Sequence, residues 1–196
     1  MTELEPDRQR NISRNRIHLS LLFGIGLMPV FIAFIVYVNF PQLLPTETTN
    51  QGRLIIPPIS NTRLDLSLAD SKWSLLMPVG QTCDPDCKQR FYLARQTNVA
   101  LGKESERVKR ILLTTQQTPE IQISDLLREY PDMGQIQLDE SLLRDTFRDV
   151  VPDSVSGNYI FLMDPHGNVM MVYTLEKMGG PLLKDLKHLL KLSNIG

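Results

Sequence analysis

The clearest hydrophobic pattern in the chain is an apolar run over residues 19–38, in which no residue is charged and Ser20 alone is clearly polar. A helix of this length covers roughly 30 Å, the thickness of a bilayer core. A cleaved signal peptide would have an apolar core of about 7–15 residues followed by small residues. This run is longer and is followed by Asn39, Phe40 and Pro41, so the pattern predicts an uncleaved transmembrane helix over 19–38.

The basic residues around this run indicate its orientation. Arginines occur repeatedly in the preceding segment 1–18, and the first basic residue after the run is Arg53. Lys and Arg are retained on the cytoplasmic side of membrane helices. We therefore expect 1–18 to be a cytoplasmic segment and the rest of the chain to lie outside the cytoplasm.

The residues after the run divide into a linker and one folded domain. In segment 39–62, prolines stand among Thr, Asn and Gln, a composition that favours an extended chain. We interpret this segment as a linker. Residues 63–196 are numerous enough to enclose one hydrophobic core, and we predict that they form a single domain.

Periodicity within 63–196 predicts alternating strands and helices. Asp84 followed by Pro85 is typical of a helix start, with a capping side chain before a proline in the first turn. Leucines near the C-terminus form one apolar stripe opposite lysines. The predicted elements are strand 73–78, helix 85–101, strand 108–115, helices 124–130 and 141–150, strands 159–163 and 169–174 joined by a turn at 164–167, and a last helix from Gly180.

This order of elements predicts the fold class. A strand–helix–strand unit, followed by a hairpin and a closing helix, gives an α/β fold with a mixed sheet flanked by helices. The order is that of a thioredoxin-like domain, here preceded by a transmembrane helix. The first strand-to-helix junction then lies at the edge where sheets of this kind carry function.

Composition excludes several classes of protein. The 21 Lys and Arg residues nearly balance the 22 Asp and Glu residues, whereas electrostatic nucleic-acid binding requires a basic surplus. The apolar share of 42% is too high for a wholly disordered chain. The 2 cysteines are too few for a disulfide-dense scaffold or a four-thiolate zinc site. No nucleic-acid partner is expected.

Both cysteines lie at the first strand-to-helix junction, as Cys83 and Cys87 in a C-x-x-x-C spacing. A helix that begins near Pro85 brings their sulfurs within bonding or chelating distance. Amides at the helix start favour the thiolate. The neighbouring Asp84 and Asp86 oppose thiolate formation but favour a bound cation, and two thiolates suit Cu(I).

Three interpretations of the pair stay open at this stage. A structural disulfide is compatible with an oxidising compartment, but it would close a very short loop and would stabilise the fold little. A redox-active pair and a metal site both fit the position at the start of the first helix. Position and loop size favour redox or metal chemistry.

With these features the chain resembles the Sco/SenC family of cytochrome oxidase assembly proteins over roughly 63–196. Segment 82–87 (TCDPDC) is similar to the family's T-x-C-P-D-x-C-P, and 117–120 (QTPE) is similar to its D-T-P-E. Segment 159–167 (YIFLMDPHG) matches the family's Y-L-I-D-P-x-G hairpin. Helices before the third predicted strand correspond to the family's insertion.

The resemblance implies a Cu(I) site made by Cys83, Cys87 and a histidine. The family's histidine would fall within 151–157, where this sequence has none, so His166 in the predicted turn is the nearby candidate. Its turn position predicts an exposed residue. Asp84 and Lys88 stand where the family has prolines. We expect His18 to be interfacial and His188 to be solvated. We expect the methionines to fill the core; these are Met77, Met163, Met170 and Met171.

The function implied by the resemblance is that of a membrane-anchored assembly factor in the maturation of an oxidase copper centre. It would reside in a bacterial inner membrane with its domain in the periplasm. Its partner would be the copper-bearing subunit of a respiratory oxidase, or another copper or thiol assembly factor. It would pass Cu(I) or keep acceptor cysteines reduced, with Cys83 attacking and Cys87 resolving the mixed disulfide. The missing histidine favours the redox role.

Two other functions compete with this one. A non-catalytic thioredoxin-like scaffold would use the cysteines as a static structural bond. A peroxiredoxin-type peroxidase would need a P-x-x-x-T/S-x-x-C motif, which segment 78–83 matches only at altered spacing. The sequence favours an assembly factor over a metabolic enzyme and leaves thiol–disulfide oxidoreductase activity open.

Overall fold

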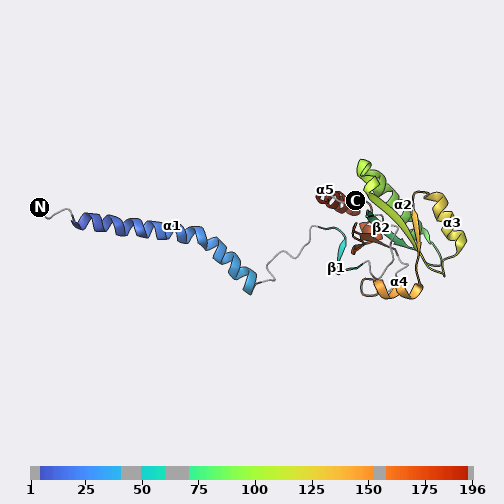
Figure 1. Cartoon of the computed structure of the whole chain (residues 1–196), viewed down its shortest axis with the longest axis horizontal. Helices are drawn as coiled ribbons and strands as arrows, with labels where there is room; N and C mark the ends of the chain where they lie inside the picture. Colours follow the sequence, from blue (N-terminus) through green and yellow to red (C-terminus); the bar gives the residue numbers. More distant parts are fainter. Residues whose placement is uncertain (1–4, 41–49, 61–70, 152–157, 194–196) are drawn as a thin grey trace. The chain divides into compact units, whose positions relative to one another are not determined.

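The computed structural model describes residues 5–40, 50–60, 71–151 and 158–193. The chain divides into two compact units, Met1–Thr48 and Thr49–Gly196. The first unit contains helix α1 (Glu5–Asn39), drawn in blue in Figure 1. Within it, His18–Asn39 is long and apolar enough to span a membrane. The helix predicted over 19–38 is therefore present, and its insertion into a membrane stays a prediction.

The second unit is built on a six-stranded mixed sheet in the order β1-β6-β5-β2-β3-β4. Strands β2, β3 and β4 are parallel. On the other side of β2, strands β5, β6 and β1 follow in turn, each antiparallel to the strand before it. The strands are β1 (Arg53–Ile59), β2 (Trp73–Pro78), β3 (Val108–Thr114), β4 (Gly134–Gln137), β5 (Tyr159–Met163) and β6 (Val169–Thr174).

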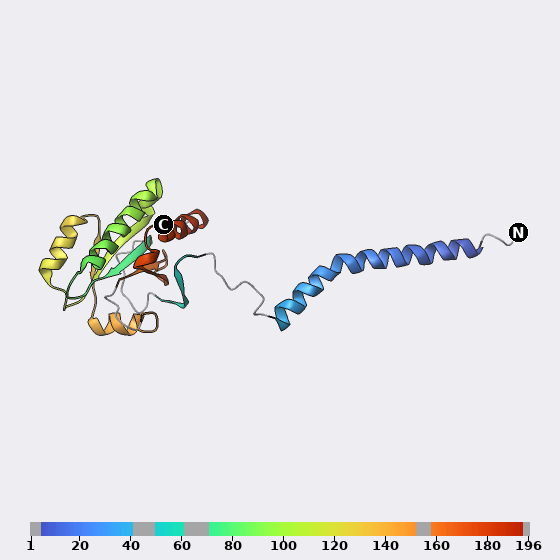
Figure 2. The ribbon, with the colours of Figure 1, turned by 180° about the vertical axis from the view of Figure 1, so that it is seen from behind.

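Helices cover both faces of this sheet. They are α2 (Pro85–Ala100), α3 (Glu120–Glu129), α4 (Glu140–Phe147) and α5 (Gly180–Leu192), with short 3-10 helices η4 (Gly102–Arg107) and η5 (Leu175–Lys177). Figures 1 and 2 show α4 on the side of the sheet opposite to α2. The sequence therefore folds into the predicted thioredoxin-like arrangement of a mixed sheet between helices.

The two faces of the sheet form two core clusters. Side chains along a strand alternate between faces. Leu75 and Met77 of β2 therefore pack with α2, α3 and α5, while Leu76 packs with Leu143 and Phe147 of α4. Every residue of β2 is buried, as expected for a strand covered on both faces. The central position of β2 fixes the junction at its carboxyl end.

Two strands differ from the sequence prediction. Segment 39–62 was interpreted as a linker, but β1 lies within it and pairs with β6 through Arg53 and Leu54. The folded unit thus begins before residue 63. Prolines are tolerated in β1 because it is an edge strand. The short strand β4, paired with β3, was missed because its GQIQ sequence has little apolar signal.

A buried carboxylate fastens the start of the folded unit to α5. Asp185 is 3% exposed and accepts hydrogen bonds from the Gln51 and Gly52 amides at 2.8 and 2.9 Å and from the Tyr173 hydroxyl at 2.9 Å. Burial and the neighbouring Asp185 raise the pKa of Tyr173. A Cβ at Gly52 would lie 2.5 Å from the Tyr173 ring, so this close approach requires glycine.

Replacing this carboxylate should weaken the fold measurably. Asp185→Ala leaves two amides and a hydroxyl without their acceptor, and we expect a loss of about 3 kcal/mol in the free energy of unfolding. Urea unfolding of the full chain in neutral detergent, followed by the fluorescence of the buried Trp73, measures the change. Asp145→Ala, at an exposed ion pair on α4, should cost less than about 0.5 kcal/mol. Equal costs would contradict the assignment.

Candidate functional site

The junction of β2 and α2 presents both cysteines at the carboxyl end of β2. The Val79 amide donates to the Leu113 carbonyl at 2.9 Å and so extends the β2–β3 ladder by one residue. Asp84 then caps α2, and its carboxylate accepts from the Cys87 amide at 2.8 Å. Pro85 occupies the first turn. The predicted cap is confirmed, and it places Cys83 just before the helix and Cys87 within the first turn.

The two cysteines are joined by a disulfide with a Cα–Cα distance of 5.2 Å. Cys87 is 5% exposed and packs in the core cluster with α2, whereas Cys83 is only partly buried. An incoming thiolate therefore has access to the sulfur of Cys83, and the sulfur of Cys87 is the leaving group.

A buried arginine lies beside Cys87. Arg90 has no exposed surface, and its Nη2 lies 3.6 Å from the Cys87 sulfur. The guanidinium also donates to the Pro78 carbonyl at 2.6 Å and to the Tyr159 carbonyl at 3.0 Å. It is thus held between the end of β2 and the start of β5.

The charge on Arg90 persists at neutral pH. Burial lowers the pKa of Arg90 to about 10, and attraction to Asp84 opposes this shift. A cation at this distance stabilises a thiolate on Cys87 relative to the neutral disulfide. A stabilised leaving thiolate also departs faster in thiol–disulfide exchange. The arrangement therefore favours reduction of the bond through attack at Cys83.

Sequence reasoning missed Arg90. It lies three residues after Cys87, on the face of α2 that is buried with Phe91 and Ala94. Residues three apart share a helix face, and a charged residue within an apolar stripe needs a partner. A charged residue on this otherwise apolar helix face was the sequence signal that could have identified Arg90.

The structure does not bring His166 into a group with the cysteines. His166 is exposed in the β5–β6 turn, where its amide donates to the Asp164 carboxylate at 2.9 Å. Among the residues that the structure describes, no three His, Cys, Asp or Glu side chains are grouped to hold a metal. The structure therefore does not group His166 with Cys83 and Cys87 as a three-residue metal site, and copper binding by the two cysteines stays a prediction. Most of the segment expected to hold the family's histidine, 152–157, lies outside the described residues.

His188 is exposed on α5, as expected for a solvated residue, and His18 is exposed on α1. The expected position of His18 at a membrane boundary stays a prediction. Met77, Met163 and Met171 are fully buried in the core clusters, and Met170 is half-buried. The burial of these methionines is consistent with a role in core packing.

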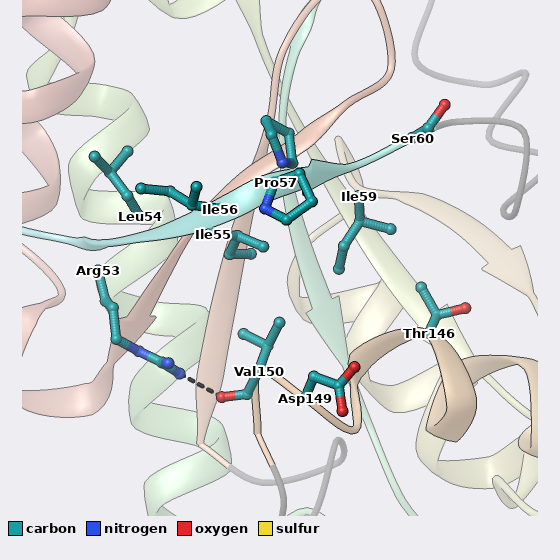
Figure 3. Close-up of a pocket in the computed structure, with 11 residues that line it drawn as sticks. Arg53, Leu54, Ile55, Ile56, Pro57, Ile59, Ser60, Thr146, Asp149 and Val150 are labelled. Atoms are coloured by element: carbon teal, nitrogen blue, oxygen red, sulfur yellow. Dashed lines mark hydrogen bonds between the residues drawn. The ribbon is translucent and has the colours of Figure 1, made fainter.

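The pockets among the described residues of the folded unit include two of interest. The larger, of about 530 Å³, lies between β1 and the end of α4 (Figure 3), where Arg53 donates to the Val150 carbonyl. Its charged lining residues are Arg53 and Asp149, and it contains neither cysteine. The smaller, of about 320 Å³, adjoins the disulfide and is called the Cys83 groove here. Its lining residues are Cys83, Lys88, Ile121, Gln122, Asp125, Leu126 and Glu129.

Comparison with known proteins places this domain in the thioredoxin-like class. Residues 73–193 match the family described as "Transmembrane-like, thioredoxin-like, C-terminal domain", and the chain belongs to that family. A search of curated proteins finds no match.

Solved structures of Sco1 proteins share this fold. Apo Sco1 from Thermus thermophilus is 16% identical, with a TM-score of 0.53 over 74% of this chain and 99% of that one. Yeast Sco1 is 12% identical, with a TM-score of 0.51 over 62% of this chain and 81% of its own. Its copper-bound form gives a TM-score of 0.51 at the same 12% identity, over 62% of this chain and 80% of its own. The resemblance noted from the motifs is therefore confirmed for the fold.

The role assigned to Arg90 can be tested by its removal. Arg90→Met takes the cation away from Cys87, so the reduced form loses stability and the reduction potential should fall by about 30–60 mV. The potential is measured by equilibrating the full chain in detergent with dithiol redox buffers and alkylating the free thiols. Arg90→Lys keeps a charge and should give an intermediate value.

Arg107→Met is the matched control for this experiment. Arg107 donates to the Leu190 and Ser193 carbonyls near the end of α5, so its loss should weaken the fold but leave the potential unchanged. An equal shift in both variants would contradict the role of Arg90.

Proposed function

We propose that this chain is a membrane-anchored thiol–disulfide exchange protein that serves the maturation of a respiratory oxidase copper centre. The observation that carries the exchange function is the buried Arg90 guanidinium beside the sulfur of Cys87. A disulfide that only stabilises the fold does not need a cation beside one of its sulfurs. The oxidase role rests on the motifs shared with Sco/SenC proteins.

The exchange runs in two balanced steps. A thiolate of a partner dithiol attacks the Cys83 sulfur and forms a mixed disulfide, while the Cys83–Cys87 bond breaks and its electron pair leaves on Cys87 beside Arg90. The second thiol of the partner, once deprotonated, attacks the partner sulfur that is bonded to Cys83. This attack releases Cys83 as a thiolate. The partner is oxidised to a disulfide and this protein is reduced. In the opposite direction Cys87 resolves the mixed disulfide and reduces the partner.

Segment His18–Asn39 of α1 is the proposed membrane anchor. Its length and apolar surface suit a bilayer, and the arginines before it favour a cytoplasmic N-terminus. We place the protein in a bacterial inner membrane with its domain in the periplasm. Its partner would be the copper-bearing oxidase subunit or another copper or thiol assembly factor.

Transfer of Cu(I) as cargo is the second candidate function. Two thiolates, one just before α2 and one in its first turn, are soft ligands that suit Cu(I), and yeast Sco1, whose fold is similar, has been solved with copper bound. In the reduced form Cys83 and Cys87 would hold the ion, and Arg90 would offset the negative charge of the two thiolates. A static scaffold remains an outcome of the tests below.

The reduction potential separates these functions. An exchange protein should equilibrate with physiological dithiols at about −120 to −270 mV, whereas structural disulfides lie below about −300 mV. We expect the full chain in neutral detergent to fall in the first range. A value below −300 mV would leave only the scaffold. Anaerobic titration of the reduced chain with Cu(I), against a Cys83→Ser/Cys87→Ser variant, reports whether copper is also bound.

Single-cysteine variants test the direction of attack. Cys87→Ser leaves the accessible Cys83 and should trap a mixed disulfide with a partner thiol, while Cys83→Ser leaves only a buried sulfur and should trap at least tenfold less. The adducts are quantified by mass spectrometry after equal exposure to oxidised glutathione. Equal trapping would reassign the attacking sulfur.

A further inference from the structure

The Cys83 groove lies between the start of α2 and one face of α3. Ile121, Asp125 and Glu129 recur every four residues along α3, so they share a helix face. They extend over about 12 Å of helix axis. An extended peptide covers this length with about four residues, and the Cys83 sulfur adjoins its path.

Hydrogen bonds hold the two walls of the groove together. The Gln122 side chain donates to the Gly80 carbonyl at 3.0 Å, and the Thr118 hydroxyl donates to the Val79 carbonyl at 3.2 Å. Both bonds join the α3 side to the segment that leads to Cys83. The rings of Phe91 in α2 and Tyr130 after α3 pack with centroids 6.0 Å apart. The groove is therefore preformed, which lowers the entropy cost of docking a segment.

The lining of the groove combines apolar and acidic surface. Ile121 is 73% exposed, and Leu126 provides a buried apolar floor. The Asp125 carboxylate is 61% exposed and pairs with Arg128 at 3.0 Å. Such exposed pairs are weak, so this carboxylate can exchange one cation for another. Glu129 adds a second carboxylate on the same wall, and Lys88 lies on the α2 side.

We propose that this groove docks an extended segment of a partner protein whose redox-active cysteine is flanked by an apolar and a basic side chain. The inference rests on the proposed exchange function and names the partner chemistry it selects. The apolar side chain packs on Ile121 and Leu126, and the basic one pairs with Asp125 or Glu129. Docking then presents the partner sulfur to Cys83.

The test uses the full-length Cys87→Ser chain in neutral detergent, with two blocked peptides. One has the sequence Leu-Leu-Cys-Lys-Lys and the other Leu-Leu-Cys-Glu-Glu, each activated as a mixed disulfide with thionitrobenzoate. The Cys83 thiolate attacks the peptide sulfur, forms the protein–peptide disulfide and releases coloured thionitrobenzoate. Each rate is divided by the rate with β-mercaptoethanol, which cancels intrinsic differences between the peptides.

We expect the basic peptide to react about fivefold to tenfold faster than the acidic one at low ionic strength. In Asp125→Asn/Glu129→Gln the ratio should fall at least threefold, and added salt should lower it in the parent. The matched control is Glu140→Gln/Asp145→Asn on α4, where Asp145 pairs with Arg148 in the same three-residue spacing. Its ratio should equal that of the parent. Replacing both peptide leucines by serine should slow the basic peptide.

The outcomes separate this inference from the proposed function. An unchanged ratio in the Asp125/Glu129 variant, or an equal fall in the α4 control, overturns the groove as the docking site and leaves exchange at Cys83 intact. Failure of Cys83 to react with either peptide overturns the exchange function itself.

Discussion

The burial of one positive charge constrains the whole neighbourhood of the disulfide. A guanidinium removed from water is costly unless its donors are met. Arg90 offsets part of that cost by donating to carbonyls at the end of β2 and the start of β5. Because these strands are neighbours in the sheet, the charge is held against a rigid support. The first turn of α2, and Cys87 with it, is thereby fixed in place.

The site follows from the position of β2 in the sheet. A central strand buried on both faces has little freedom to shift, so the chain leaves it at a defined point. The cap at Asp84 then starts α2 immediately and uses the Cys87 amide as its donor. One sulfur therefore lies inside the core and the other faces the groove along α3. This asymmetry gives the two sulfurs different chemical roles from one short segment.

Sequence patterns predicted the parts of this fold that are dominated by burial. Strand β2 and helix α5 have strong apolar signals, and the cap at Asp84 has a local one. Strand β1 was missed because Pro57 and Pro58 suggested a linker, and β4 because its pairing with β3 depends on distant residues. Arg90 was missed for a related reason: its role arises from carbonyls 12 and 69 residues away, which no local pattern contains.

The hydrogen bonds between Asp185 and the amides of Gln51 and Gly52 also have a mechanical consequence. If the chain before residue 50 holds the domain at a surface, a force along that chain enters the domain at these hydrogen bonds. The load then passes into α5 and the outer strand pair β1–β6, rather than into the segment that carries Cys83. A moving partner can therefore exert force on the tethered domain while the geometry around its disulfide is preserved.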